Sequence, residues 1–381
     1  MEKSIQSLSY KLILLFIFAF NSQNAKSQNL IHKDEIISLV IKQGLDKMYN
    51  LEFEESEKIF LEIKKKYPNN PAYDFLMAMN TFIKMYTNNT YKEKSAENLN
   101  YLLASLEKTK KLDALHPNDP EVIFFYMSIY SSITLYYSQR KETIKAINFA
   151  KKTYDFLRQG YNLKNQYNEL YFSAGIYDFY REQYPETHPV YKSFMWLFAP
   201  GDKIKAIKEL EYAAQNAVLT KTEAHSYLTT ISIKYLSNYE NAAHHASYLH
   251  KNYPNNLVYT TRNIEALLLS GKYEEAEKLL PLISNTNKKI FEMAYHIFKG
   301  ILLEKKEKKY DLALGYYGKG IQFSKEVEFP VNDFLGHAYL GIARIFKHRG
   351  EIKSAKIYFE KTLEKSDYVA FKKEAESNLK Q

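Results

Sequence analysis

Four histidines lie close together in the sequence, and imidazole nitrogens are common metal ligands in proteins. His225, His244, His245 and His250 fall within two neighbouring predicted helices. Two imidazoles one helical turn apart can bind zinc, but His244 and His245 are adjacent and therefore point in different directions. No carboxylate completes a ligand set at a suitable spacing. We expect packed or exposed histidines and no metal site.

The other residues with chemical potential do not form a catalytic set. Gly315–Gly320 carries three glycines around Lys319, but no strand precedes it and no Gly-Lys-Ser/Thr sequence closes it, as a phosphate-binding loop requires. Close helix packing accounts better for Gly320. The adjacent Glu54 and Glu55 lie on a solvent-facing turn, with no cleft to raise a pKa. We therefore predict that the protein is not an enzyme, has no catalytic residue and binds no cofactor.

Residues 184–201 form an aromatic and proline-rich insert that holds the only tryptophan of the chain. Its three prolines oppose a long regular helix, whereas Phe194–Phe198 is too apolar to remain in water. We expect the insert to dock, with Trp196 and Phe198 as anchors. It either fills a gap between helices or forms a lip for a peptide, glycan or aromatic ligand. The residues of this possible lip are Tyr171, Tyr177, Tyr180, Arg181, Tyr191, Trp196 and Phe198.

Composition favours an all-α protein. The 381 residues are 45% hydrophobic and 25% charged, which allows a buried core, and they include only 12 glycines and 10 prolines. The chain exceeds the length that one compact core usually supports. Several domains or an elongated array of repeats are therefore expected.

The amino-terminal residues have the pattern of a secretory signal. Lys3 and Lys11 precede the apolar run Leu12–Phe20, and Ala25 and Ser27 supply small residues for cleavage. We predict that residues 1–27 are a signal peptide. The alternative is an uncleaved membrane anchor. The chain has no cysteine, so a lipoprotein signal and disulfides are excluded. The expected mature protein is exported, soluble and periplasmic or extracellular, with no integral membrane span.

The net charge gives little support to nucleic-acid binding. The formal charge is +9, and the signal contributes three lysines against one glutamate, a net of +2, which leaves +7 on the mature chain. Lysines alternate with glutamates along the predicted helices, as in Glu274–Lys278, and no basic stripe is present. We expect no nucleic-acid partner.

A short motif recurs in the second half of the chain and indicates repeats. The segments 238–242, 272–276, 309–313 and 351–355 align without gaps and all end in alanine. These alanines are 34, 37 and 42 residues apart, near the period of about 34 residues expected for tetratricopeptide repeats.

The chain resembles the tetratricopeptide repeat family. Residues 37–70 match its pattern, with a small residue at 44, aromatic residues at 53 and 60, a small residue at 56 and a closing Pro68. The resemblance implies a right-handed superhelical α-solenoid of about eight helical hairpins and a terminal helix. We expect tetratricopeptide-like hairpins over residues 28–183, the insert, and a tetratricopeptide array over residues 202–381. The helices are expected near 33–48, 52–66, 71–86, 93–113, 120–138, 141–158, 166–183, 202–217, 222–236, 239–252, 257–270, 273–284, 287–305, 309–325, 331–349, 351–365 and 368–380.

The family resemblance also implies a function. First helices of such arrays line a concave groove that holds a peptide. We expect a non-catalytic scaffold or adaptor of the cell envelope that binds a protein or peptide. The alternative is a small-ligand or glycan-binding protein that uses the insert. Basic groove members hint at acidic groups on the partner. The groove residues carried over from the family pattern are Tyr227, Ile231, Lys234, Tyr235, Thr261, Glu265, Leu268, Leu340, Arg344, Lys347 and His348.

Overall fold

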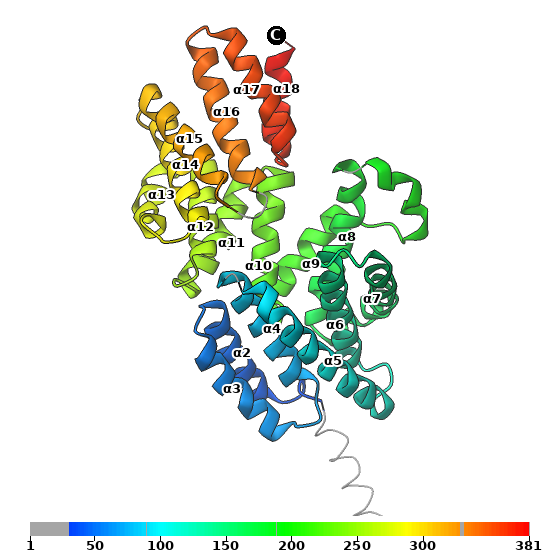
Figure 1. Cartoon of the computed structure of the whole chain (residues 1–381). Coiled ribbons are helices and arrows are strands. Elements are labelled where there is room, and N and C mark those ends of the chain that lie inside the picture. Colours follow the sequence, from blue (N-terminus) through cyan, green and yellow to red (C-terminus); the bar gives the residue numbers. More distant parts are fainter. Residues whose placement is uncertain (1–29, 89, 188, 328–330, 381) are drawn as a thin grey trace, which may run out of the picture. The chain divides into compact units, whose positions relative to one another are not determined.

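The computed structural model describes residues 30–88, 90–187, 189–327 and 331–380, so the predicted signal peptide lies outside the described residues. Within these ranges the regular structure is entirely helical. The chain divides into two compact units, with the boundary between Lys221 and Thr222. Figure 1 identifies the helices by label. None of the described helices is both long enough and apolar enough to span a membrane.

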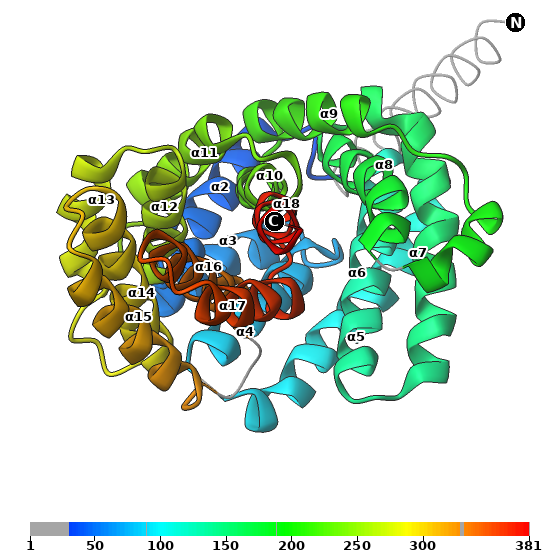
Figure 2. The same cartoon turned by 90° about the horizontal axis from the view of Figure 1, so that it is seen from above.

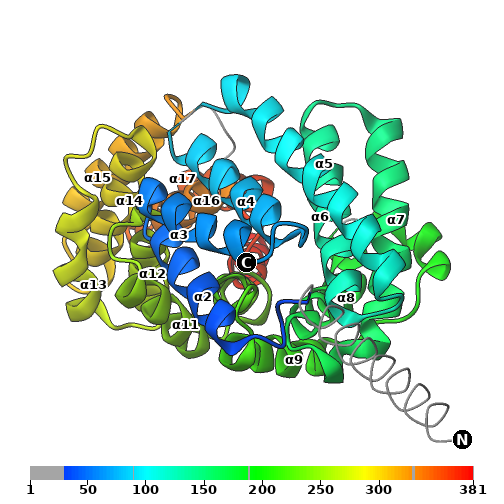
Figure 3. The ribbon, with the colours of Figure 1, turned by 90° about the horizontal axis from the view of Figure 1, so that it is seen from below.

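Unit 1 consists of sequential antiparallel pairs, with α2 on α3, α4 on α5, α6 on α7 and α8 on α9. Figure 3 shows α6 and α7 lying side by side. The described α-helices of unit 1 are α2 (Glu35–Tyr49), α3 (Phe53–Lys66), α4 (Ala72–Thr87), α5 (Tyr91–Leu115), α6 (Pro120–Gln139), α7 (Thr143–Leu163), α8 (Glu169–Thr187) and α9 (Lys203–Asn216).

Unit 2 continues the same pattern. The π-helical turn Ser232–Leu236 that ends α10 packs on α11, and then α12 pairs with α13, α14 with α15 and α16 with α17, while α18 closes the unit. Figure 2 shows α14 beside α15 and α16 beside α17. The described helices are α10 (Lys221–Ile231), α11 (Tyr239–Asn252), α12 (Leu257–Leu269), α13 (Tyr273–Leu279), α14 (Lys289–Lys305), α15 (Tyr310–Ser324), α16 (Asn332–His348), α17 (Ile352–Lys365) and α18 (Val369–Leu379).

Small residues lie where paired helices cross. The alanines that end the four aligned motifs, at 242, 276, 313 and 355, are all buried. A Cβ added at Gly44 of α2 would collide with the ring of Phe60 of α3, and one at Gly320 of α15 would collide with Ile297 of α14. Close packing therefore explains Gly320, as the sequence predicted.

The expected fold class is confirmed within the described residues: the structure is an all-α array of eight helical hairpins and a terminal helix. Most predicted helix ends lie within a few residues of the observed ones. Among the larger differences, α7 was expected to end near residue 158 but runs to Leu163, and α8 was expected to end near Gln183. It continues to Thr187 with Pro185 inside it. The insert then forms a 3-10 helix over Pro189–Leu197 and belongs to unit 1.

Candidate functional site

The insert presents apolar side chains to solvent, contrary to the expectation that it docks through its tryptophan. Trp196 is 80% exposed, Leu197 53% and Phe198 36%. Figures 1 and 2 show the segment between α8 and α9 projecting away from the helices of unit 1. Phe198 lies edge-on to Tyr154 of α7, with the ring centres 5.0 Å apart. Trp196 is therefore not a buried anchor.

Polar contacts at the base hold the insert in place. The Arg181 guanidinium of α8 donates to the carbonyl oxygen of Met195 at 2.7 Å and to that of Phe198 at 3.4 Å. The Tyr177 hydroxyl donates to the carbonyl oxygen of Ala199. Burial raises the pKa of Tyr177, so its proton remains available for this bond. Two predicted lip residues, Tyr177 and Arg181, thus fix the backbone of the insert.

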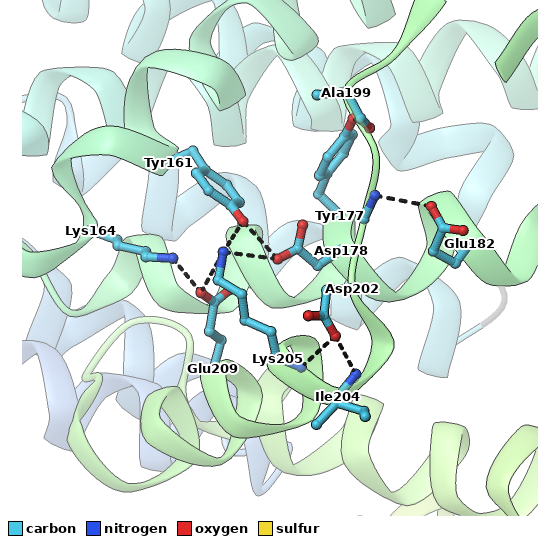
Figure 4. Close-up of polar contacts among 11 residues, drawn as sticks. Tyr161, Lys164, Tyr177, Asp178, Glu182, Ala199, Asp202, Ile204, Lys205 and Glu209 are labelled. Carbon is cyan, nitrogen blue, oxygen red and sulfur yellow. Dashed lines mark hydrogen bonds and ion pairs between the residues drawn. The ribbon is translucent and has the colours of Figure 1, made fainter. Parts of the chain in front are cut away.

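Further hydrogen bonds hold the carboxyl-terminal end of the insert. The Ala199 amide donates to the Tyr154 hydroxyl at 3.1 Å, and the Gly201 amide donates to the Glu182 carboxylate at 3.0 Å. Asp202 then caps α9, because its carboxylate accepts from the amides of Ile204 and Lys205. Figure 4 shows the contacts of Glu182 and Asp202. Tyr180 is half-buried beside the ring of Phe179, and the side chain of Tyr191 lies outside the described residues.

A charged cluster lies behind the base of the insert (Figure 4). The Tyr161 hydroxyl donates to the Asp178 carboxylate at 2.8 Å and also contacts the Lys205 ammonium. Lys205 lies 3.5 Å from Asp178 and 3.7 Å from Glu209, which also pairs with Lys164. Burial alone would lower the pKa of Lys205, but the tyrosine and the two carboxylates raise it overall. The cluster joins α7, α8 and α9 and supports the insert.

A cavity of about 230 Å³ opens in unit 1 next to this cluster. Three connections far apart in the sequence form it together with α2: the segment before α2, the α7–α8 connection and the chain after α9. The predicted lip residue Tyr171 lies at its edge, where its hydroxyl donates to Asn165 at 2.6 Å and its ring lies 4.2 Å from that of Tyr212. The lining residues are Ile31, His32, Ser38, Ile41, Asn165, Gln166, Tyr167, Asn168, Glu169, Asn216, Val218 and Leu219.

Buried carboxylates build the walls of the cavity and leave it without a free charge. Glu169 accepts hydrogen bonds from the amides of Val218, Leu219 and Thr220 at 2.7 to 3.1 Å, and from the Thr220 hydroxyl at 2.8 Å. Its counterpart Glu121 in α6 fixes the residues before α2 in a similar way. The remaining polar lining consists of His32, Ser38, Tyr167 and four side-chain amides, those of Asn165, Gln166, Asn168 and Asn216.

The contacts of Glu121 tie the start of the described chain to α6. Its carboxylate accepts hydrogen bonds from the backbone amides of Ile31 at 2.9 Å and His32 at 2.8 Å, and from the side-chain amide of Asn70 at 2.8 Å. The His32 ring lies 2.8 Å from the same carboxylate and 5.4 Å from the ring of Tyr167. Burial raises the pKa of Tyr167 well above its usual range, so this lining residue stays neutral.

The predicted groove residues of unit 2 are mostly not on its surface. Five of them are at most 4% exposed, namely Ile231, Thr261, Glu265, Leu268 and Leu340. Tyr227 is 39% exposed, Lys347 and His348 are exposed, and Lys234, Tyr235 and Arg344 are half-buried. Within the described residues, α14 packs on both α12 and α16, and α18 packs on the π-helical end of α10.

A buried ionic network occupies the place of the expected groove. Glu265 accepts hydrogen bonds from Arg262 at 2.6 Å and His337 at 2.9 Å, and from the Tyr368 hydroxyl. Burial alone would raise the pKa of Glu265, but the charge of Arg262 and these hydrogen bonds hold it well below its usual range. Asp333 pairs with Arg262 at 3.3 Å.

Two basic groove members that hinted at an acidic partner are paired within the chain. Lys234 lies 2.9 Å from Asp333. Arg344 lies 3.0 Å from Glu374 and 3.7 Å from Glu304. Internal carboxylates therefore account for these two charges without a partner.

The histidines behave as packing residues. His225 and His245 are buried, their Nδ1 atoms are 2.9 Å apart, and the His225 ring stacks on Tyr248 with centres 3.8 Å apart. His250 lies 3.0 Å from the Thr260 hydroxyl, and burial lowers its pKa. Across the residues that the structure describes, no group of three or more His, Asp or Glu side chains is arranged to hold a metal.

The cavity was not predicted from the sequence. Asn165 and Asn168 mark a polar connection between two helices, and this connection is the one local feature of the sequence that points to the cavity. Asn216 and His32 come from distant connections, so only the folded arrangement brings them together.

Comparisons with known proteins assign no family. No protein-family model matches the chain, and no curated protein matches it. Among solved structures, the chain is similar to the human IFIT1 dimer with m7Gppp-AAAA, at 14% identity over 82% of this chain and 67% of that one, with a TM-score of 0.38. It is similar to the human IFIT1 dimer with PPP-AAAA at 12% identity over 82% and 68%, with a TM-score of 0.36. It is also similar to yeast Tom70 at 10% identity over 91% and 96%, with a TM-score of 0.24. Scores this low carry no functional argument, and the fold rests on the helix pairing described above.

Proposed function

We propose that this helical-repeat protein is a non-catalytic scaffold or adaptor of the cell envelope, and that the cavity of unit 1 holds a short segment of a protein or peptide partner. The amide-rich lining of that cavity, whose carboxylate Glu169 is hydrogen-bonded within the chain, is the observation that carries the proposal. The envelope location rests on the predicted signal peptide over residues 1–27.

The lining suits a peptide backbone. Asn and Gln side chains each supply an acceptor oxygen and two donor hydrogens, as a peptide group supplies one acceptor and one donor. Asn165 and Gln166 are exposed at the cavity, while Glu169 is already saturated by internal donors. A neutral segment can therefore enter without leaving a charge unpaired.

The size of the cavity limits what it can hold. A protein cavity of about 150 Å³ accommodates benzene. At about 230 Å³, the cavity in unit 1 accepts one or two residues of a partner rather than a folded element. The rest of the contact must then lie on the surrounding surface, where the tilted rings of Tyr171 and Tyr212 lie 4.2 Å apart.

Site-specific cross-linking tests the proposal. A photoreactive group at Gln166 should capture a defined protein from envelope extracts, whereas the same group at the exposed Lys111 of α5 should not. Recovery of the same proteins from both positions would contradict the proposal. The alternative, a small-ligand or glycan-binding protein that uses the insert, is favoured if oligosaccharides quench Trp196 fluorescence while Gln166 captures nothing.

A further inference from the structure

The tip of the insert combines exposed apolar side chains with a rigid base. Trp196 and Leu197 end the 3-10 helix, and both are more than half exposed. Arg181 and Tyr177 fix the backbone directly beneath them. A contact surface that is already ordered loses little conformational freedom when it binds.

The exposed apolar surface continues onto α7. The Phe198 ring contacts Tyr154, and Ile147 lies two helical turns before Tyr154 on nearly the same face. Ile147 is 62% exposed, and Ile144, one turn earlier, is 78% exposed. An apolar strip therefore runs from the insert along this helix.

Basic residues border the strip. Residues 187–201 contain Lys192 and no Asp or Glu, and the side of α7 that carries Ile147 and Tyr154 also carries Lys151 and Arg158 against Asp155. Lys145 and Lys152 lie on the other side of this helix, where their ammonium groups lie over the rings of Tyr137 and Tyr130. The neighbouring acidic groups are paired with cations: Glu186 lies 2.8 Å from Lys203, and Glu142 lies 2.7 Å from Lys145. The exposed charge of this face is therefore positive.

From this combination we infer that the insert and the outer face of α7 dock on an anionic membrane surface. Tryptophan and aliphatic side chains insert at the boundary between headgroups and acyl chains, while lysines and arginines pair with anionic headgroups. A projecting tip with apolar residues between lysines fits a lipid interface better than a flat protein interface. The inference rests on the proposed envelope location and is independent of the proposed protein partner.

Trp196 makes the test direct, because it is the only tryptophan of the chain and reports its own environment. The full mature chain is titrated with vesicles of phosphatidylglycerol and phosphatidylcholine in equal parts, and with vesicles of phosphatidylcholine alone. The anionic vesicles should shift the emission to the blue, and brominated acyl chains should quench it. Phosphatidylcholine alone should do neither. Added salt should weaken the binding.

Variants separate the two components of the contact. Leu197→Ser should lower the partition coefficient, measured by sedimentation, about tenfold, and Lys151→Ala and Lys192→Ala should each lower it about fivefold. Ile36→Ser is the matched control, because Ile36 in α2 is 69% exposed and lies outside the strip.

Several results would overturn the inference. These are an unshifted emission with anionic vesicles, an equal loss of binding in the Ile36 control, a shift that depends on protein concentration without lipid, and a shift that only protein extracts produce. The third result would indicate a second copy of the chain, and the fourth a protein partner at the insert. If the proposed protein partner is wrong and the membrane contact is right, the photoreactive group at Gln166 should capture no protein while the chain still binds anionic vesicles.

Discussion

Replacement of Glu265 by glutamine tests whether unit 2 is closed around its ionic network. Glutamine keeps the shape and one acceptor oxygen but removes the charge that pairs with Arg262 at 2.6 Å. Glu265 is fully buried, and breaking a buried pair costs about 3 to 5 kcal/mol, because the remaining charge stays unpaired. Asp333 still lies 3.3 Å from Arg262, so we expect the lower end, about 3 kcal/mol.

The assay is urea denaturation of the full mature chain followed by circular dichroism. The midpoint should fall while the dependence of the unfolding free energy on urea stays the same. Tyr368→Phe should cost about 1 kcal/mol, and the double variant should lose less than the sum, because both side chains belong to one network.

Glu364→Gln is the matched control. Glu364 is exposed and pairs only with its neighbour Lys365, so its replacement should cost less than about 0.5 kcal/mol. If Glu265→Gln lowers the free energy of unfolding by no more than this control does, the Glu265 carboxylate faces water, and unit 2 is not closed around it.

Three further predictions concern single contacts. Gly44→Ala should destabilise the protein by about 1 to 3 kcal/mol in the same denaturation assay, because the added Cβ would collide with Phe60. Gly315→Ala is the control: there is open space around Gly315, so this change should stabilise the protein by about 0.5 to 1 kcal/mol. Equal effects of the two changes would contradict the assigned helix crossing. Asp34 caps α2 and lies 2.6 Å from Lys66, and Lys66 together with Tyr67 lowers the pKa of Asp34 to about 2. The contribution of Asp34 to folding stability should therefore be complete above about pH 4 and disappear as the pH falls towards 2. Asp34→Asn should cost about 1 kcal/mol at pH 7, and a cost that persisted at pH 2 would show that the charge is not responsible. Trp196→Ala should melt within a degree or two of the parent, because the ring is 80% exposed, and a loss of about 3 kcal/mol would show that the tryptophan is buried after all.

Local sequence features predicted the helices well, because helix ends depend on near neighbours. α11 spans Tyr239–Asn252 as expected. The helices α3, α5 and α11 each end two residues before a proline. Pro185 was the exception, since α8 continues past it to Thr187. A proline therefore located three of these helix ends and failed at the fourth.

The functional surfaces were predicted less well, because they depend on tertiary arrangement. The resemblance to tetratricopeptide repeats placed Glu265 and Leu340 on an open groove, but both are fully buried, and Glu265 is bonded to His337 and Tyr368. Burial was expected for Trp196 from its residue type alone, yet a projecting segment keeps it in solvent. The cavity joins connections that start near residues 31, 165 and 216, and no local pattern relates them.

The affinity of the captured partner for Gln166→Glu would test the proposed function most directly. This change adds a negative charge to the amide-rich lining without altering its shape, and the same change at the exposed Gln322 of α15 serves as the control. The expected result is at least about tenfold weaker binding for the first variant and parental binding for the second, since a charge left unpaired on binding is costly. Parental affinity for both variants would show that the partner does not enter this cavity.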